Sequence, residues 1–269
     1  MSLSACTLDF DRYYGNESSV PAEASAGPRD AADIDASALP APGDGAADVV
    51  ASDGGGTLDD GLTAFYQFDE TNGTSAIDSS GNARTAMLLG GASFAAGVQG
   101  NAASVSGAGQ YVAVPAEAVR GLTSFSICVW FNLSSVPTWS RIFEFGTGTT
   151  VYMFLTAKSD TNSLRFAIST EGNSATKEQR LEAPSLPAGS WHHVAVTLNG
   201  TASTLYVDGT SVDTKTLTLN PTSLGTTTNN WLGRSSFNDP YLQGRLDKLR
   251  IYSRALGASE VQSLVQQRQ

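Results

Sequence analysis

The chain has 269 residues, of which 41% are hydrophobic, and its formal net charge is −10. This length is long for one domain and short for two large ones, and the hydrophobic fraction suffices for a core. The charge is uneven: residues 1–60 hold twelve acidic residues and only Arg12 and Arg29, whereas the remainder is neutral. A neutral domain lacks the electrostatic footprint of a nucleic-acid-binding protein. No apolar run reaches the roughly 18 residues of a membrane-spanning helix.

Residues 1–14 contain the tetrapeptide LSAC at 3–6. It resembles a bacterial lipobox, whose cysteine becomes the lipid-modified first residue of a lipoprotein. The resemblance implies a diacylglycerol anchor on Cys6, an outer-membrane lipoprotein at the cell surface, and membrane contact only through the lipid. A signal peptide needs a basic region and about 7–15 apolar residues before the motif. Only two residues precede it here, so the start is truncated or recloned, or the match is due to chance; a Cys6–Cys128 disulfide is a further alternative.

Residues 15–60 are dominated by Ala, Asp, Gly, Pro and Ser, and no aromatic residue occurs from Gly15 to Ala64. Such a composition cannot bury enough apolar surface to offset the entropy lost on ordering. We predict a disordered, self-repelling acidic linker that serves as a stalk. A tail that binds a partner is the alternative.

Residues 61–269 consist of short segments in which apolar residues recur at a spacing of two, between turn residues. This spacing is typical of strands with one buried face. Asn199–Gly200 and Asp208–Gly209 predict tight hairpins, because these residues readily adopt positive φ. Segment 255–267 is the one predicted helix, with Leu256, Val261, Leu264 and Val265 on one stripe. The predicted strands are 63–68, 110–115, 124–133, 140–146, 150–157, 163–170, 192–198, 203–209 and 244–252.

Strands that follow one another without intervening helices indicate an all-β, two-sheet antiparallel sandwich. The segments also resemble the concanavalin A-like, laminin-G-like jelly-roll family. In family order they are GLTAFYQFDETNGTSAIDSSGNARTAML, SFSICVWF, WHHVAVTLNGTASTLYVDGTSV and WLGRSSFNDPYLQGRLDKLRIYSRALGASEV. The resemblance implies one jelly-roll domain over 61–269. Cys128, where a small residue is usual, and Lys248, where a second acid is common, depart from the pattern.

His192 and His193, the only histidines, are adjacent in a predicted strand and therefore point to opposite faces. They cannot bind one metal ion together. We expect one to face the core and the other to face outward, with no acidic or nucleophilic companion. Glycan cleavage needs two carboxylates roughly 5–10 Å apart, yet no strand carries acids at i and i+2 or i+4, and Glu144 stands alone. The sequence predicts a protein that is not an enzyme, although carboxylates on different strands could converge.

The loop DSSGN at 78–82 is the candidate metal site. Calcium prefers six to eight oxygen ligands, and a compact loop with a flexible glycine lets carbonyl groups converge. From the residues alone an Asx turn at Asp78 is the favoured alternative. The family resemblance implies a structural calcium near such a loop, held by Asp78, Asn82 and Asp247.

Four aromatic residues lie in or beside turn-rich segments, where exposed rings can stack on sugars; these candidates are Trp139, Trp231, Phe237 and Tyr241. Ordinary packing at the rim of the sandwich is the alternative for each ring. We expect a monomeric, extracellular binding or adhesion module, tethered at the cell surface, that recognises a glycan or a protein. A glycoside hydrolase or lyase of the same fold and a purely structural surface protein are the alternatives.

Overall fold

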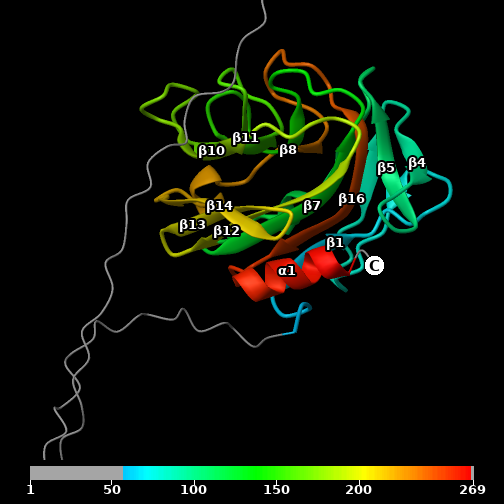
Figure 1. Ribbon diagram of the computed structural model, residues 1–269, viewed down its shortest axis with the longest axis horizontal. Helices are drawn as coiled ribbons and strands as arrows, with labels where there is room; N and C mark the ends of the chain where they lie inside the picture. The colour runs from blue at the N-terminus through cyan, green and yellow to red at the C-terminus, as the bar shows by residue number, and fades with distance from the viewer. Residues whose placement is uncertain (1–56, 268–269) are drawn as a thin grey trace, which may run out of the picture. The chain divides into compact units, whose positions relative to one another are not determined.

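The structure, a computed structural model, describes residues 57–267. Two antiparallel sheets of eight strands each pack face to face, and Figure 1 shows them as two layers with one short helix below. The predicted all-β sandwich with a C-terminal helix is therefore confirmed. The lipobox-like Cys6 and all but the end of the acidic segment 15–60 lie outside the described residues.

The first layer, which we call sheet A, is organised around the last strand of the chain. That strand, β16, pairs with β7 along one side, and along its other side it pairs with β5 and with β1. The last strand of the domain therefore pairs with its first strand. In spatial order the strands are β14 (Thr210–Thr216), β13 (Ala202–Val207), β12 (Trp191–Asn199), β7 (Phe125–Leu133), β16 (Gln243–Tyr252), β5 (Asn101–Ser106) and β4 (Ser93–Ala96), with β1 (Leu62–Tyr66) beside β16.

The second layer, sheet B, is built largely from the middle of the chain. In spatial order its strands are β11 (Gln179–Pro184), β10 (Ser163–Ser169), β9 (Tyr152–Thr156), β8 (Arg141–Gly146), β15 (Asn229–Leu232), β6 (Tyr111–Ala113), β3 (Ala86–Leu89) and β2 (Ser75–Ala76). Two 3₁₀ turns, η1 (Ala116–Ala118) and η2 (Pro221–Leu224), and the helix α1 (Ala258–Gln266) complete the described domain.

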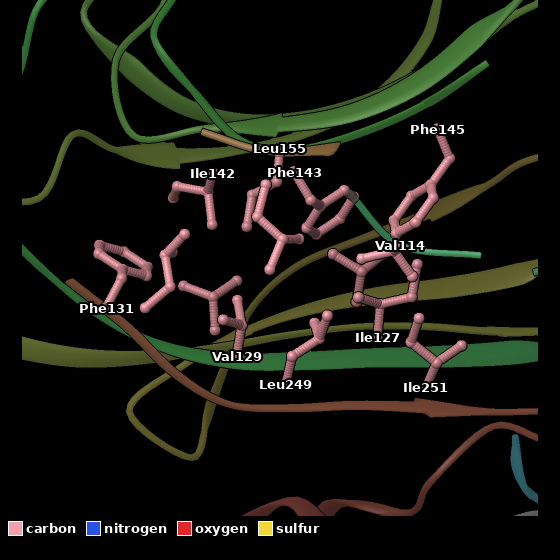
Figure 2. Packing of buried hydrophobic residues seen from close by; sticks show 14 of the residues in the cluster. Val114, Ile127, Val129, Phe131, Ile142, Phe143, Phe145, Leu155, Leu249 and Ile251 are labelled. Atoms are coloured by element: carbon pink, nitrogen blue, oxygen red, sulfur yellow. The ribbon is translucent and has the colours of Figure 1, made fainter. Parts of the chain in front are cut away.

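The core fills the space between the inner faces of the sheets. Figure 2 shows Ile127, Val129 and Phe131 of β7 rising toward Phe143 and Phe145 of β8. These residues are spaced by two, because alternate side chains of a strand share a face. All are at most 1% exposed, and burying one such side chain contributes about 1.5–3 kcal/mol.

The two predicted hairpins are present at the edge of sheet A. Asp208 (φ 49°) and Gly209 (φ 85°) form a two-residue turn between β13 and β14, and positive φ at both positions is the type I′ geometry. Between β12 and β13, Asn199 pairs with Ala202, so Gly200 (φ 58°) begins the turn and Asn199 remains in the strand.

Helix α1 covers part of the outer face of sheet A. Val261 and Leu264, both at most 1% exposed, pack with Tyr252 and Cys128, whereas Val265 of the predicted stripe is only half-buried. Glu260 caps the helix by accepting the Gly257 N–H (2.9 Å). Cys128 is a buried free thiol, and burial raises its pKa to about 12.

All nine predicted strands are present, with boundaries shifted by at most a few residues. Seven further strands were not predicted: β2, β3, β4, β5, β11, β14 and β15. Several are too short to show a period, and β14 is exposed or half-buried along its length, so no apolar alternation marks it.

Candidate functional site

Sheet B carries polar and aromatic side chains on its outer face, away from the core. On β9, Met153 and Leu155 enter the core, whereas Tyr152 and Phe154 belong to a separate cluster on the other side. Arg165 on β10 shares this face and lines the same pocket as Tyr152 and Phe154. Regular strand alternation therefore produces an apolar inner face and a mixed outer face from the same strands.

A β-bulge in β8 brings Arg141 and Glu144 onto this outer face. The pairing of β8 with β9 shifts register between Arg141 and Phe143, so that one extra residue is accommodated. The Arg141 Nε then donates to Glu144 Oε2 at 3.2 Å. Regular alternation would place residues three apart on opposite faces, so the bulge is what brings Arg141 and Glu144 to the same face.

The outer face and its neighbouring loops enclose a pocket of about 320 Å³, at the lower end of the range for small-molecule sites. Its walls are aromatic: Trp139 meets Phe154 edge-on at 6.2 Å, and Phe237 meets Tyr152 edge-on at 5.6 Å. Besides Arg141, its charged and amide lining residues are Asp160, Arg165, Asn173, Glu178, Arg180 and Asp239. Two of the four predicted ligand-binding aromatics, Trp139 and Phe237, thus come together in one site.

Arg141 forms the floor of the pocket and holds its walls in place. Its guanidinium carbon lies 3.9 Å from the centroid of Phe154. The guanidinium donates to the Trp139 carbonyl (2.8 Å) and pairs with Glu144 (3.2 Å) and Asp239 (3.0 Å). The side chain is only 3% exposed, and this burial lowers the pKa of Arg141 despite the two carboxylates. Since its charge is compensated from two sides, Arg141 is a positioning residue.

Trp139 has a strained backbone at the rim of the pocket. Its φ is +69°, a left-handed conformation that costs a bulky side chain on the order of 1 kcal/mol or more. Its N–H donates to the Lys158 carbonyl (2.8 Å), and its own carbonyl accepts from Arg141. The surroundings therefore enforce a conformation that turns a half-buried indole toward the pocket.

Arg165 organises the opposite wall. Its Nε donates to Glu182 Oε1 (2.8 Å), and its Nη2 lies 3.3 Å from Asp160 Oδ1. Arg180 shares Glu182, at 3.4 Å. The pKa of Glu182 is lowered, although burial opposes this, because Ser163 and the two arginines favour the charged form.

Glu178 is the pocket carboxylate with an upward pKa shift. Its side chain is 5% exposed, and burial raises its pKa although Tyr152 and nearby arginines favour the anion. The Tyr152 hydroxyl donates to Glu178 Oε1 at 2.9 Å, and Arg165 lies 3.7 Å from the other oxygen. Glu178 follows no strand pattern in the sequence, so no local signal indicated its place here.

The other two predicted aromatics lie outside the pocket. Trp231 points outward from β15, directly across from Glu144, and packs edge-on against Tyr111 at 6.1 Å. The Arg234 guanidinium covers it, 4.1 Å from the ring centroid. Tyr241 is half-buried and does not line the pocket.

The loop predicted to hold calcium is already satisfied by its own chain. Asp78 Oδ1 accepts the N–H groups of Phe65 (3.0 Å) and Ser80 (2.9 Å), and Oδ2 accepts that of Arg84 (2.9 Å). Asn82 uses its amide as a donor, toward the carbonyls of two β1 residues. This is the Asx-type turn favoured by the residues alone, and a loop whose acceptors are filled by donors does not fit calcium.

Asp247, the third expected calcium ligand, lies at the bulge of β16. Its Oδ2 accepts the Val98 N–H (2.9 Å), its buried Oδ1 has no hydrogen-bond partner, and burial raises its pKa to about 7. The neighbouring Lys248, at φ +47°, donates to Gln99 and is buried. Asp247 shares no hydrogen-bond partner with Asp78 or Asn82, which both contact Ser80. Residues 57–267 hold no group of three His, Cys, Asp or Glu side chains that could bind a metal. As a set, they do not fit the expected ion.

The histidine pair splits across the sheet as predicted, but its surroundings differ from the prediction. His192 points toward the core side beside Phe131, and its Nδ1 lies 2.9 Å from Asp208 Oδ2. His193 points to the outer side against Trp130, is 1% exposed, and has its pKa lowered to about 3 by burial. The expectation of no acidic companion is wrong, because the hairpin folds Asp208 back onto both residues.

A family model described as the concanavalin A-like lectin/glucanases superfamily matches residues 106–262. Comparison with curated proteins gives no match. Within residues 57–267, the structure has no helix long and apolar enough to cross a membrane.

Several solved structures share the fold at low sequence identity. Domain 4 of AbnA, a GH43 extracellular arabinanase from Geobacillus stearothermophilus, in complex with arabinotriose, is 23% identical with a TM-score of 0.64 and covers 76% of this chain and 98% of that one. Trypanosoma rangeli sialidase is 17% identical with a TM-score of 0.58, over 76% of this chain and 33% of that one. The binding domain of botulinum neurotoxin serotype D is 16% identical with a TM-score of 0.59, over 78% and 52% respectively.

Proposed function

Since the chain belongs to the concanavalin A-like lectin/glucanases superfamily, we propose that it is a non-catalytic binding module and that the pocket on the outer face of sheet B binds carbohydrate. The observation that carries this proposal is the pairing of aromatic walls with a polar floor. Trp139 and Phe237 are half-buried rings, and guanidinium and carboxylate groups stand between them. Sugars have an apolar face that stacks on rings and hydroxyl groups that both donate and accept hydrogen bonds.

The solved structures with this fold support a binding role. One is a domain in complex with arabinotriose, and another is the binding domain of a neurotoxin. A protein ligand is the alternative. A pocket of about 320 Å³ suits a small ligand better than it suits the flat surface of a protein.

A glycan array with the full chain tests the site directly, and calorimetry then measures the affinity for the best ligand. Trp139→Ala and Phe237→Ala should each weaken binding at least tenfold, because stacking of a sugar on these residues depends on the aromatic ring. Tyr241→Ala serves as the control, since this half-buried ring does not line the pocket. Retention of full affinity by both pocket variants would exclude this site.

A hydrolase of the same fold is the second candidate, and one observation favours it. Glu178 has a raised pKa and lines a pocket that also contains Asp239, and glycosidases use an acid with a raised pKa opposite a second carboxylate. Against it, Asp239 is held by Arg141 at 3.0 Å and by Ser235 at 2.9 Å. Reducing-sugar release from a polysaccharide panel, lost in Glu178→Gln, would establish the enzyme and overturn the non-catalytic proposal.

We further propose an extracellular location, with Cys6 as a lipid anchor and residues 15–60 as the acidic spacer. The support is the lipobox-like LSAC followed by a low-complexity segment, together with a fold found in an extracellular arabinanase and a neurotoxin. Mass spectrometry of the natural protein from membrane fractions should find diacylglycerol on Cys6. An unmodified Cys6 there would reject the anchor.

A further inference from the structure

The charges around the pocket are numerous, and their balance restricts the ligand. Three guanidinium groups line it: Arg141, Arg165 and Arg180. Three carboxylates line it with them: Asp160, Glu178 and Asp239. Two more carboxylates pair with these arginines from behind, Glu144 with Arg141 and Glu182 with Arg165 and Arg180.

The net charge of these eight groups is negative in both protonation states considered. With every group ionised they sum to −2, and with Glu178 protonated they sum to −1. Burial raises the pKa of Glu178, but even protonation of this carboxylate would leave the sum negative. An anionic ligand would enter a region of like charge, which lowers affinity and the rate of encounter.

Each arginine is also already committed to a resident carboxylate. Arg141 pairs with Asp239 at 3.0 Å, Arg165 with Glu182 at 2.8 Å, and Arg180 with Glu182 at 3.4 Å. An incoming carboxylate or sulfate would have to share a guanidinium whose charge one of these carboxylates already compensates, and would lie close to that like charge. An uncharged hydroxyl group needs only to share a donor or acceptor, so no ion pair is broken.

We infer that the pocket selects an uncharged sugar and discriminates against sugars that carry a carboxylate or sulfate. Its aromatic walls take the apolar face of the ring, and its alternating guanidinium and carboxylate groups take the hydroxyl groups as donors and acceptors. This inference rests on the proposed function, since it names the ligand class of that same pocket.

Calorimetry with the full chain measures the affinity for the neutral and the acidic member of each sugar pair. Lactose is paired with sialyllactose, and galactotriose with trigalacturonic acid, beside arabinotriose and xylotriose as further neutral probes. At 20 mM salt we expect the acidic member of a pair to bind at least tenfold more weakly than the neutral one. The gap should narrow at 500 mM salt, because rim charges such as Asp160, with a side chain 64% exposed, are screened.

Two variants distinguish an effect of charge on the choice of sugar from a general loss of sugar binding. Asp160→Asn removes one rim carboxylate and should narrow the ratio between neutral and acidic sugars by about threefold. Glu117→Gln, on an exposed side chain outside the pocket, should leave both affinities unchanged. Equal or tighter binding of the acidic member overturns the inference but leaves the carbohydrate site intact. Failure of every sugar, neutral and acidic, overturns the proposed function itself.

Discussion

Arg250 on the outer face of sheet A and Arg141 on that of sheet B have the same local geometry. Each guanidinium carbon lies 3.9 Å from the centroid of a phenylalanine ring, Phe65 and Phe154 respectively. Arg250 lies in a face that α1 covers, and it donates to Gln267 just beyond the helix. Arg141 forms the floor of a pocket that solvent enters. An arginine stacked on a phenylalanine thus contributes to packing on the outer face of sheet A, which α1 covers and which we call the covered face. The same pair lines a candidate site on the outer face of sheet B, which we call the open face.

The covered face should be the more sensitive to acid. His193 is buried there with a pKa of about 3, whereas an unfolded histidine titrates near 6.5. Its folded pKa is lowered, so the unfolded state binds the proton first and stability is lost as pH falls from about 6.5 toward 3. Between pH 7 and 4 the wild type should lose about 3 kcal/mol more than His193→Gln. Chemical denaturation at a series of pH values measures this, with His192→Gln, which keeps His193, as the control; parallel curves would contradict it.

The covered face should also depend on its helix. Leu264→Ala removes a side chain that is 1% exposed beneath α1, and large-to-small changes at such positions cost about 3 kcal/mol. Sugar affinity should be unchanged, because the pocket lies on the other sheet. Gln266→Ala, on the exposed side of the same helix, is the matched control. A loss of binding without loss of stability would show that the two faces are coupled.

A substitution of Asp247 should change stability by a smaller amount, and it also tests whether the domain binds calcium. Asparagine keeps the acceptor for the Val98 N–H and removes a buried charge with one unpartnered oxygen. We expect Asp247→Asn to stabilise the domain by about 1 kcal/mol at pH 8, and a chelator to leave the unfolding midpoint of the wild type unchanged. A midpoint that rises with calcium, and does so only while Asp247 is present, would establish the ion and refute the fit argument.

The smallest effect is expected on the open face. Trp139→Gly should be more stable than Trp139→Ala by about 1 kcal/mol, because glycine adopts φ +69° without strain. Both variants should lose sugar binding equally, since both lack the ring. Thermal unfolding of the pair, with binding measured alongside, provides the comparison; greater stability of the alanine variant would show that the backbone at this position is not strained.

The main strands of the sandwich and one of its turns could be predicted from the local sequence. Alternation at a spacing of two predicted the main strands, and Asp208–Gly209 predicted its turn, because both depend on neighbouring residues. The open face was predicted only in part. Trp139 and Phe237 were identified as exposed aromatics in turn-rich segments, but nothing local indicated that they share one pocket.

The polar groups of that pocket could not be predicted, for two physical reasons. The bulge in β8 changes side-chain parity between Arg141 and Glu144 without any sequence mark. Glu178 and Asp239 reach the pocket from loops distant in sequence, and their positions depend on tertiary contacts to Tyr152 and Arg141. A search for acids on one strand therefore misses carboxylates that gather from several.

The first described residues are fixed on the same side of the sandwich as α1. Arg254 donates to the carbonyl groups of Thr57 (3.2 Å) and Asp60 (2.8 Å), and Leu58 packs against the cluster that contains Val261. In Figure 1 this end of the chain lies near α1, while β8, β10 and β11 form the opposite layer. The described domain therefore begins at the outer face of sheet A, and the pocket lies on the opposite side of the sandwich, on the outer face of sheet B.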